Sequence, residues 1–201
     1  MYICFTPKFK LKMGPYPIFV CKQTHLNLIK YLCRRYGGGM EIKMTLKQLK
    51  DIKEKTDKGE LQSPPDTVYV NNHIHTTYSF SPYSPTAAVY AARMEGLCTA
   101  GIIDHDSISG AEEFLEAAKL VEMPVTIGME ARISMDGTRL EGRRTNNPDQ
   151  VGVSYMTIQS VPHDKIGVLT EFFKPYQAAR HERNRQMIAK INELVGVELD
   201  Y

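Results

Sequence analysis

The sequence predicts an α/β fold, and three short apolar segments carry this prediction. Residues 68–70, 98–103 and 125–127 have the length and composition of buried strands. Helical patterns separate the three segments, and this alternation favours parallel strands joined by right-handed crossovers. Each segment runs into His, Asp or Glu residues. Because the carboxyl ends of parallel strands meet at one edge of a sheet, we expect a polar functional site at that edge.

The helices before and between the first strands are predicted from capping residues. Thr45 can cap a solvated helix over residues 45–58. Ser84 and Pro85 have the residue types that begin a helix, and Gly96 is a typical residue at a helix end. A helix before the first strand and another after it are therefore expected.

The second half of the chain continues the same pattern. A helix is expected over residues 108–121, with Ser107 or Asp106 as its cap. A polar loop, a fourth strand and two further helices are predicted to follow the third strand, at residues 136–150, 151–161, 164–173 and 177–195.

Charge and glycine content predict three regions along the chain. Residues 1–39 form a basic extension that we expect outside the core, 40–65 a helix and linker, and 66–201 the main domain. Residues 1–40 hold seven of the 25 basic residues and no acidic ones, so residues 41–201 have 18 basic against 23 acidic residues, a net charge of −5. The extension is either a functional basic arm or a segment translated from upstream of a start at Met40 or Met44.

The bulk composition is that of an ordinary globular protein, with 42% hydrophobic and 24% charged residues. No apolar run is long enough to predict a membrane-spanning helix. The four cysteines, Cys4, Cys21, Cys33 and Cys98, are widely spaced and form no C-x-x-C pair. This spacing favours free thiols in a reducing compartment, so we expect a cytoplasmic protein, with Cys98 in a buried strand.

A pair of histidines, His73 and His75, follows the first predicted strand. In extended backbone, residues two apart project from the same face. Two neutral imidazole nitrogens on one face can hold a metal ion. The sequence therefore predicts a metal site at this strand end.

The next two predicted strands end in further candidate ligands. Asp104, His105 and Asp106 follow the second strand, and Glu130 follows the third. Imidazole and carboxylate together suit zinc, manganese or iron, and a bridging Glu suits a site with two or more ions. Asp104 and Asp106 are the expected catalytic residues, although Asp104 could instead orient an imidazole and Asp106 could cap the following helix.

These motifs carry a family resemblance. The segments H-I-H-T-T-Y-S (73–79), I-I-D-H-D-S (102–107) and I-G-M-E (127–130) resemble the first motifs of the PHP (polymerase and histidinol phosphatase) family. The resemblance implies a distorted (β/α)7 barrel of the TIM type with up to three metals at its mouth. It implies metal ligation by His73, His75, His105 and Glu130, with His163 as the next family histidine.

The chain also departs from that family's pattern. Phe80 and Ser81 stand where many relatives place an Asp or His, and the family's closing His and Asp-x-His have no counterpart. We therefore expect residues 66–201 to form a partial, C-terminally incomplete barrel of low activity.

The function expected from these residues is metal-dependent hydrolysis of a phosphate ester by activated water. The substrate would be a small phosphorylated molecule or a nucleic-acid end, with no membrane partner. Two alternatives stay open: a catalytically incomplete metal-binding module and a metal-dependent amidohydrolase. Arg143 and Arg144 could clamp a phosphate or could simply be solvated, and His25 and His181 are expected at the surface.

Overall fold

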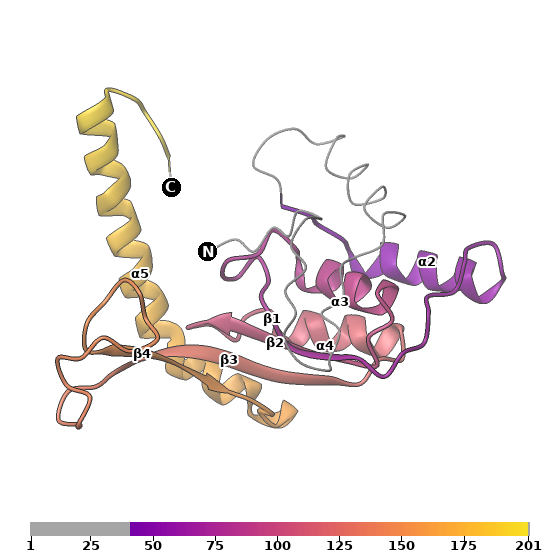
Figure 1. The fold of residues 1–201 in the computed structure, drawn as a ribbon. Coiled ribbons are helices and arrows are strands. Elements are labelled where there is room, and N and C mark those ends of the chain that lie inside the picture. Colours follow the sequence, from indigo (N-terminus) through magenta and orange to yellow (C-terminus); the bar gives the residue numbers. More distant parts are fainter. Residues whose placement is uncertain (1–40, 201) are drawn as a thin grey trace, which may run out of the picture. The chain divides into compact units, whose positions relative to one another are not determined.

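The structure is a computed structural model that describes residues 41–200, so the predicted extension of residues 1–39 lies outside it. The described residues form a four-stranded sheet in the order β1-β2-β3-β4, with β1 to β3 parallel and β4 antiparallel. These strands are labelled in Figure 1. The strands are β1 (Val70–Ile74), β2 (Thr99–His105), β3 (Val125–Ser134) and β4 (Val153–Ile158). The helices are α2 (Leu46–Asp57), α3 (Pro85–Met94), α4 (Ala111–Leu120), the short 3-10 helix η1 (His163–Lys165) and α5 (Ile166–Val195).

Two predicted helix starts are confirmed by their caps. The Thr45 side chain accepts a hydrogen bond from the Gln48 backbone N–H, and the Gln48 side chain accepts one from the Thr45 N–H. Ser84 accepts from the Ala87 N–H, with Pro85 at the first helical position. Such caps satisfy backbone donors that have no partner within the helix.

The predicted start of the third helix is wrong. The helix α4 begins at Ala111 instead of residue 108, and no side chain caps it. The Ser107 hydroxyl accepts from the Ser109 N–H within the preceding turn. The Asp106 carboxylate is bound by arginines, and Asp106 has a left-handed backbone with φ of 48°. Both expected caps are therefore engaged before the helix begins.

The first strand also differs from its prediction. It begins at Val70, and Val68, which was expected in the strand, is 85% exposed. Cys98 is a free thiol, as expected, but it is exposed rather than buried because β2 begins one residue later. The exposure of Val68 follows from the position of β1, which is an edge strand of the described sheet and therefore has a neighbouring strand on one side only.

The last strand, β4, runs in the opposite direction to the other three. A hairpin joins β3 to the antiparallel β4, and η1 then leads into α5. The two helices predicted for residues 164–173 and 177–195 are one helix of 30 residues that continues through Pro175. Figure 1 shows α5 running along the sheet and past its edge. None of the helices in residues 41–200 is long and apolar enough to cross a membrane.

The main hydrophobic cluster lies on one face of the sheet. Ile102 of β2 and Ile127 of β3 are register partners, and both belong to the buried cluster that contains Phe114 of α4 and Val89 of α3. Alternate residues along a strand project from opposite faces. His105 and Glu130 are three residues further along their strands and therefore project from the other face, away from this core.

Candidate metal centre

The register of the sheet brings the predicted ligands together. His105 of β2 is the direct neighbour of Glu130 of β3. On β1, Ile74 pairs with Ile102, so the flanking His73 and His75 project from the face that carries His105.

A bulge in β1 contributes to this placement. Three steps from Asn71 to Ile74 oppose two steps on β2, from Ala100 to Ile102. The Asn71 side chain accepts a hydrogen bond from the His73 N–H at 3.0 Å and so stabilises the irregular backbone. Bulges of this kind redirect side chains near functional sites.

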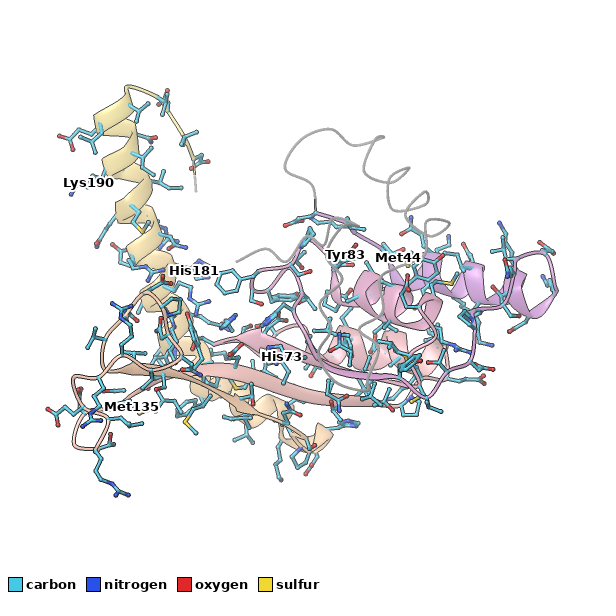
Figure 2. All side chains as sticks on the ribbon, in the orientation of Figure 1. Met44, His73, Tyr83, Met135, His181 and Lys190 are labelled. Atoms are coloured by element: carbon cyan, nitrogen blue, oxygen red, sulfur yellow. The ribbon has the colours of Figure 1, made fainter. Side chains whose placement is uncertain are left out.

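Three imidazoles converge on one carboxylate oxygen. The Nε2 atoms of His73, His75 and His105 lie 3.4, 3.8 and 3.3 Å from Glu130 Oε2. One ligand atom from each of His73, His75 and Glu130 fits within a mutual spacing of 4.8 Å. The rings of His75 and His105 stack with centroids 4.8 Å apart. Figure 2 shows His73 at the end of β1.

The electrostatics favour neutral histidines. Burial, together with the neighbouring His105 and His73, lowers the pKa of His75 below its ordinary value of 6.5. Burial likewise lowers the pKa of His105, although Glu130 and Asp106 act in the opposite direction. Both imidazoles are therefore mainly neutral at pH 7 and keep a nitrogen lone pair for a metal.

The side chains present fit a divalent transition metal. Neutral imidazoles and one carboxylate form the ligand set that zinc, manganese and iron accept. In addition, His105 Nδ1 is buried and has no hydrogen-bond partner among the described residues. A buried nitrogen in this position is costly unless a further ligand or water satisfies it.

Asp104 belongs to a hydrogen-bond relay behind His75. It is 1% exposed, and its carboxylate accepts from the Thr76 N–H, the Thr76 hydroxyl and the Ser79 hydroxyl. Ser79 Oγ also lies 3.2 Å from His75 Nδ1. Because the Ser79 proton goes to Asp104, the hydroxyl oxygen must accept from His75 Nδ1–H. This tautomer leaves the lone pair on Nε2, the nitrogen that faces Glu130.

Asp106 has a different environment. Its Oδ2 accepts from Arg132 Nε at 2.7 Å and from the Arg180 guanidinium at 2.8 Å, and its Oδ1 accepts from the Arg132 N–H. Its own N–H donates to the Glu130 carbonyl at 2.8 Å. Asp106 therefore joins the end of β2 to β3 and to the helix α5.

Sequence reasoning missed Ser79, Thr76, Arg132 and Arg180. One signal was available, since a carboxylate at the end of a buried strand, such as Asp104, needs nearby donors. Ser79 and Thr76 lie inside the first motif. Arg180 gives no local signal, because it is 74 positions away from Asp106.

The remaining predicted residues that the structure describes are all exposed. His163 is exposed on η1, at the opposite edge of the sheet, because β4 runs antiparallel, so the structure does not bring it to the cluster. Arg143 and Arg144 are exposed in the β3–β4 loop, where the Arg144 guanidinium binds the Pro148 carbonyl. His181 is exposed on α5, as expected.

Phe80, which stands where the sequence comparison led us to expect an Asp or His, packs against the outside of the cluster. Its ring is edge-on to the His105 ring with centroids 4.6 Å apart, and the residue is 66% exposed. An aromatic ring therefore stands beside the histidines where a further ligand was expected in relatives.

The chain resembles known proteins over part of its length. It is 29% identical over 120 residues to an error-prone DNA polymerase of Mycobacterium tuberculosis, which is 56% of this chain and 10% of that protein. It is 35% identical over 65 residues to a 5'-3' exoribonuclease of Haemophilus influenzae, which is 32% of this chain and 24% of that protein. The chain thus spans a quarter or less of these relatives.

Two solved structures have weak overall similarity. A provisional metal-dependent phosphoesterase of Bifidobacterium adolescentis and an amidohydrolase of Chromobacterium violaceum align with TM-scores of 0.47 and 0.49. Each is 23% identical and covers 65% of this chain and 40% of the other. The family model of the PHP domain matches residues 71–198, which is more than half of the chain. The chain therefore belongs to the PHP domain family, and its α/β sheet is part of a TIM-like barrel of that type.

Proposed function

We propose that this domain is a metal-dependent hydrolase that acts on phosphate esters. The observation that carries the proposal is the convergence of three imidazole nitrogens on Glu130, with His75 and His105 kept neutral by burial. His73, His75 and Glu130 would hold one divalent ion, zinc, manganese or iron. Glu130 and His105 would bind a second.

In the proposed site, Asp104 and Asp106 position the residues around the metal. Bound metal would supply an acidified water and positive charge for phosphoryl oxygens. Asp104 acts through Ser79 to fix the His75 tautomer, so that Nε2 faces the metal position. Asp106 holds Arg132 and Arg180 next to the cluster. The two aspartates expected as catalytic are thus proposed as positioning residues.

A phosphate ester is favoured over an amide because cations border the cluster. Arg132 and Arg180 lie at the same sheet edge as His105, and guanidinium groups bind phosphoryl oxygens in a fork-like geometry. The names of the matched polymerase and exoribonuclease concern nucleic acid. A nucleic-acid end or a small phosphorylated molecule is therefore the proposed substrate, and the cytoplasm the proposed location.

A metal-binding module without catalysis is the second candidate. Phe80 favours it, because a ring takes the place of a ligand beside His105 and so removes one anchor for a further ion. In that case the domain would bind metal at full occupancy but would not turn over substrate.

The test is hydrolysis by the full chain loaded with manganese or zinc. We expect weak, metal-dependent cleavage of p-nitrophenyl phosphate, no cleavage of p-nitroacetanilide, and loss of activity in Glu130→Gln. His181→Gln is the matched control, since His181 is exposed on α5. Full metal occupancy without turnover would support the non-catalytic module, and cleavage of the anilide alone would support an amidohydrolase.

A further inference from the structure

The imidazole of His105 lacks the kind of hydrogen bond that orients its neighbour His75. His75 Nδ1 lies 3.2 Å from the Ser79 hydroxyl, whereas His105 Nδ1 is buried and has no hydrogen-bond partner in the described part of the chain. A histidine that binds a metal through one ring nitrogen is usually oriented by a hydrogen bond from the other nitrogen. The orientation of the His105 ring must therefore come from other contacts.

Three rings pack around the His105 imidazole. The His75 ring is stacked on it with centroids 4.8 Å apart, and the Phe80 and Tyr155 rings meet it edge-on at 4.6 and 5.0 Å. Such packing restricts the rotamers of the imidazole, because a rotated ring would collide with one of its neighbours. Phe80 is 66% exposed, while Tyr155 lies within β4, so Tyr155 is the better anchored of the two edge-on rings.

The register of β4 places the Tyr155 side chain on the cluster side of the sheet. Tyr155 is the direct neighbour of Arg132 on β3, and Thr157 is the direct neighbour of Glu130. Because residues two apart along a strand share a face, Tyr155 projects from the face that carries Glu130 and His105. The position of the Tyr155 backbone therefore decides where this ring meets His105.

The side chain of Asn146 holds that backbone at the open edge of the sheet. β4 is an edge strand of the described sheet, so its outer backbone groups have no neighbouring strand. Asn146 Nδ2 donates to the Tyr155 carbonyl at 2.9 Å, and Asn146 Oδ1 accepts from the Tyr155 N–H at 2.9 Å. The preceding Thr145 hydroxyl lies 2.6 Å from the Ser154 hydroxyl. Asn146 thus makes the two hydrogen bonds that a further strand would make at Tyr155.

We propose that Asn146 and Tyr155 act together as positioning residues for His105. Asn146 fixes the Tyr155 backbone, and the Tyr155 ring keeps the imidazole in the rotamer whose Nε2 lies 3.3 Å from Glu130 Oε2. Neither residue touches the metal in this arrangement. The consequence for hydrolysis rests on the proposed function, in which His105 and Glu130 hold the second ion.

The first test observes the His105 ring by NMR in metal-free protein. Aromatic ring currents shift the signals of nearby carbon-bound protons, and the His105 signals are assigned with His105→Gln. Tyr155→Leu removes one ring, so these signals should move toward those of the exposed His181. Asn146→Ala should move them in the same direction by a smaller amount, because the ring stays while its backbone loses two hydrogen bonds. Unchanged His105 signals in Tyr155→Leu would overturn the proposal.

Two further variants separate positioning from other effects. Gln150→Ala is the matched control for Asn146→Ala, since it removes an exposed amide side chain from the same loop. It should leave the His105 signals in place. Tyr155→Phe keeps the ring and loses only the hydroxyl, so it should rescue the wild-type signals. Equal shifts in Asn146→Ala and Gln150→Ala would contradict the role of Asn146.

The second test titrates zinc into the same variants by calorimetry. Tyr155→Leu should weaken binding of the second ion, the one lost in His105→Gln, by about tenfold, the low end of the range for residues that orient a ligand. It should leave the ion at His73 and His75 unchanged, and Tyr155→Phe should restore the second ion. Equal weakening of both ions, or a loss in Tyr155→Phe as large as in Tyr155→Leu, would overturn the proposal. Absence of hydrolysis would contradict the proposed function alone, because neither test depends on turnover.

Discussion

Two acidic residues at the same edge of the sheet, Glu130 and Asp106, have opposite surroundings. Three imidazoles surround Glu130, and two guanidinium groups bind Asp106. Both side chains are mostly buried, with 15% and 12% exposed. The difference therefore lies in the partners and not in the depth.

The partners determine what each carboxylate can do. A neutral imidazole has a lone pair and can share a metal ion with a carboxylate, whereas guanidinium keeps its proton and has no lone pair to offer. The Glu130 surroundings are thus suited to a metal ion that comes from outside. The Asp106 carboxylate already has cationic partners from the protein itself, the guanidinium groups of Arg132 and Arg180.

The largest expected effect comes from removing two imidazoles from the Glu130 side. His73→Ala with His75→Ala should weaken zinc affinity by roughly a thousandfold or more, because sites with four ligands bind zinc with about 10–16 kcal/mol. Metal analysis after purification, with competitive chelation, measures the change. Arg180→Gln, which removes a guanidinium partner of Asp106, should keep its metal. Equal metal content in the double variant would remove these histidines from the site.

Neutralising Asp106 and neutralising Glu130 should have different effects on the free energy of unfolding. In metal-free protein, Asp106→Asn should lower the free energy of unfolding by about 2 kcal/mol. This is less than the cost of breaking a fully buried pair, because 35% and 30% of the Arg132 and Arg180 side chains are exposed. Glu130→Gln should leave it unchanged or raise it, because Gln carries no buried charge.

Urea unfolding in EDTA measures the free energy of unfolding of both variants. Metal titration then measures the metal affinity of each variant. Asp106→Asn should bind metal like the wild type, and Glu130→Gln should not. If both variants lost stability equally, the contrast between the two carboxylates would be wrong.

A smaller effect is expected from the relay behind His75. Ser79→Ala removes the acceptor for Nδ1–H and should weaken metal affinity by about tenfold, within the usual range for residues that orient a ligand. Ser81→Ala is the control, since Ser81 lies in the same loop and accepts from the Tyr83 N–H. Ser79→Thr keeps a hydroxyl and should restore part of the affinity. A change in Ser79→Ala no greater than in Ser81→Ala would contradict the relay.

The smallest effect concerns pH. The pKa values of His75 and His105 are lowered from 6.5, so each imidazole becomes positively charged only at a lower pH than an ordinary histidine. Protons and metal compete for the same nitrogens. Protonation of these two residues should therefore reduce metal affinity by less than about twofold between pH 8 and 7, and more steeply below that, because both pKa values lie under 6.5. A tenfold fall already between pH 8 and 7 would contradict the lowered pKa values.

The clustered residues were predictable because their positions follow from local rules. His73, His75, His105 and Glu130 each follow an apolar segment, and neighbouring parallel strands bring these positions together. Glu130 lies within β3 and not after it, because β3 continues to Ser134. The fold class and the caps Thr45 and Ser84 depend on neighbouring residues in the same way. Short-range patterns therefore located both the sheet and one side of the site.

The remaining features depend on contacts that no local pattern encodes. The direction of β4 decides where His163 lies, yet a strand has the same alternation in either direction. Asp106 looked like a helix cap because Asp commonly is one, and its real partner Arg180 lies on a distant helix. Exposure of Cys98 depends on the residue at which β2 begins, and strand ends are the least certain feature of a sequence pattern.

The distance along the chain between Asp106 and Arg180 matters during translation. Translation at about 5–20 residues per second needs roughly 3–10 seconds to pass from Glu130 to Arg180. During that interval all four residues of the cluster have been synthesised, while the α5 arginines do not yet exist. Until Arg180 is synthesised, Arg132 is the only one of these two arginines that can pair with Asp106. A nascent chain that is released or cut before residue 180 would therefore carry every side chain of the metal cluster but would lack Arg180, the partner of Asp106 on α5.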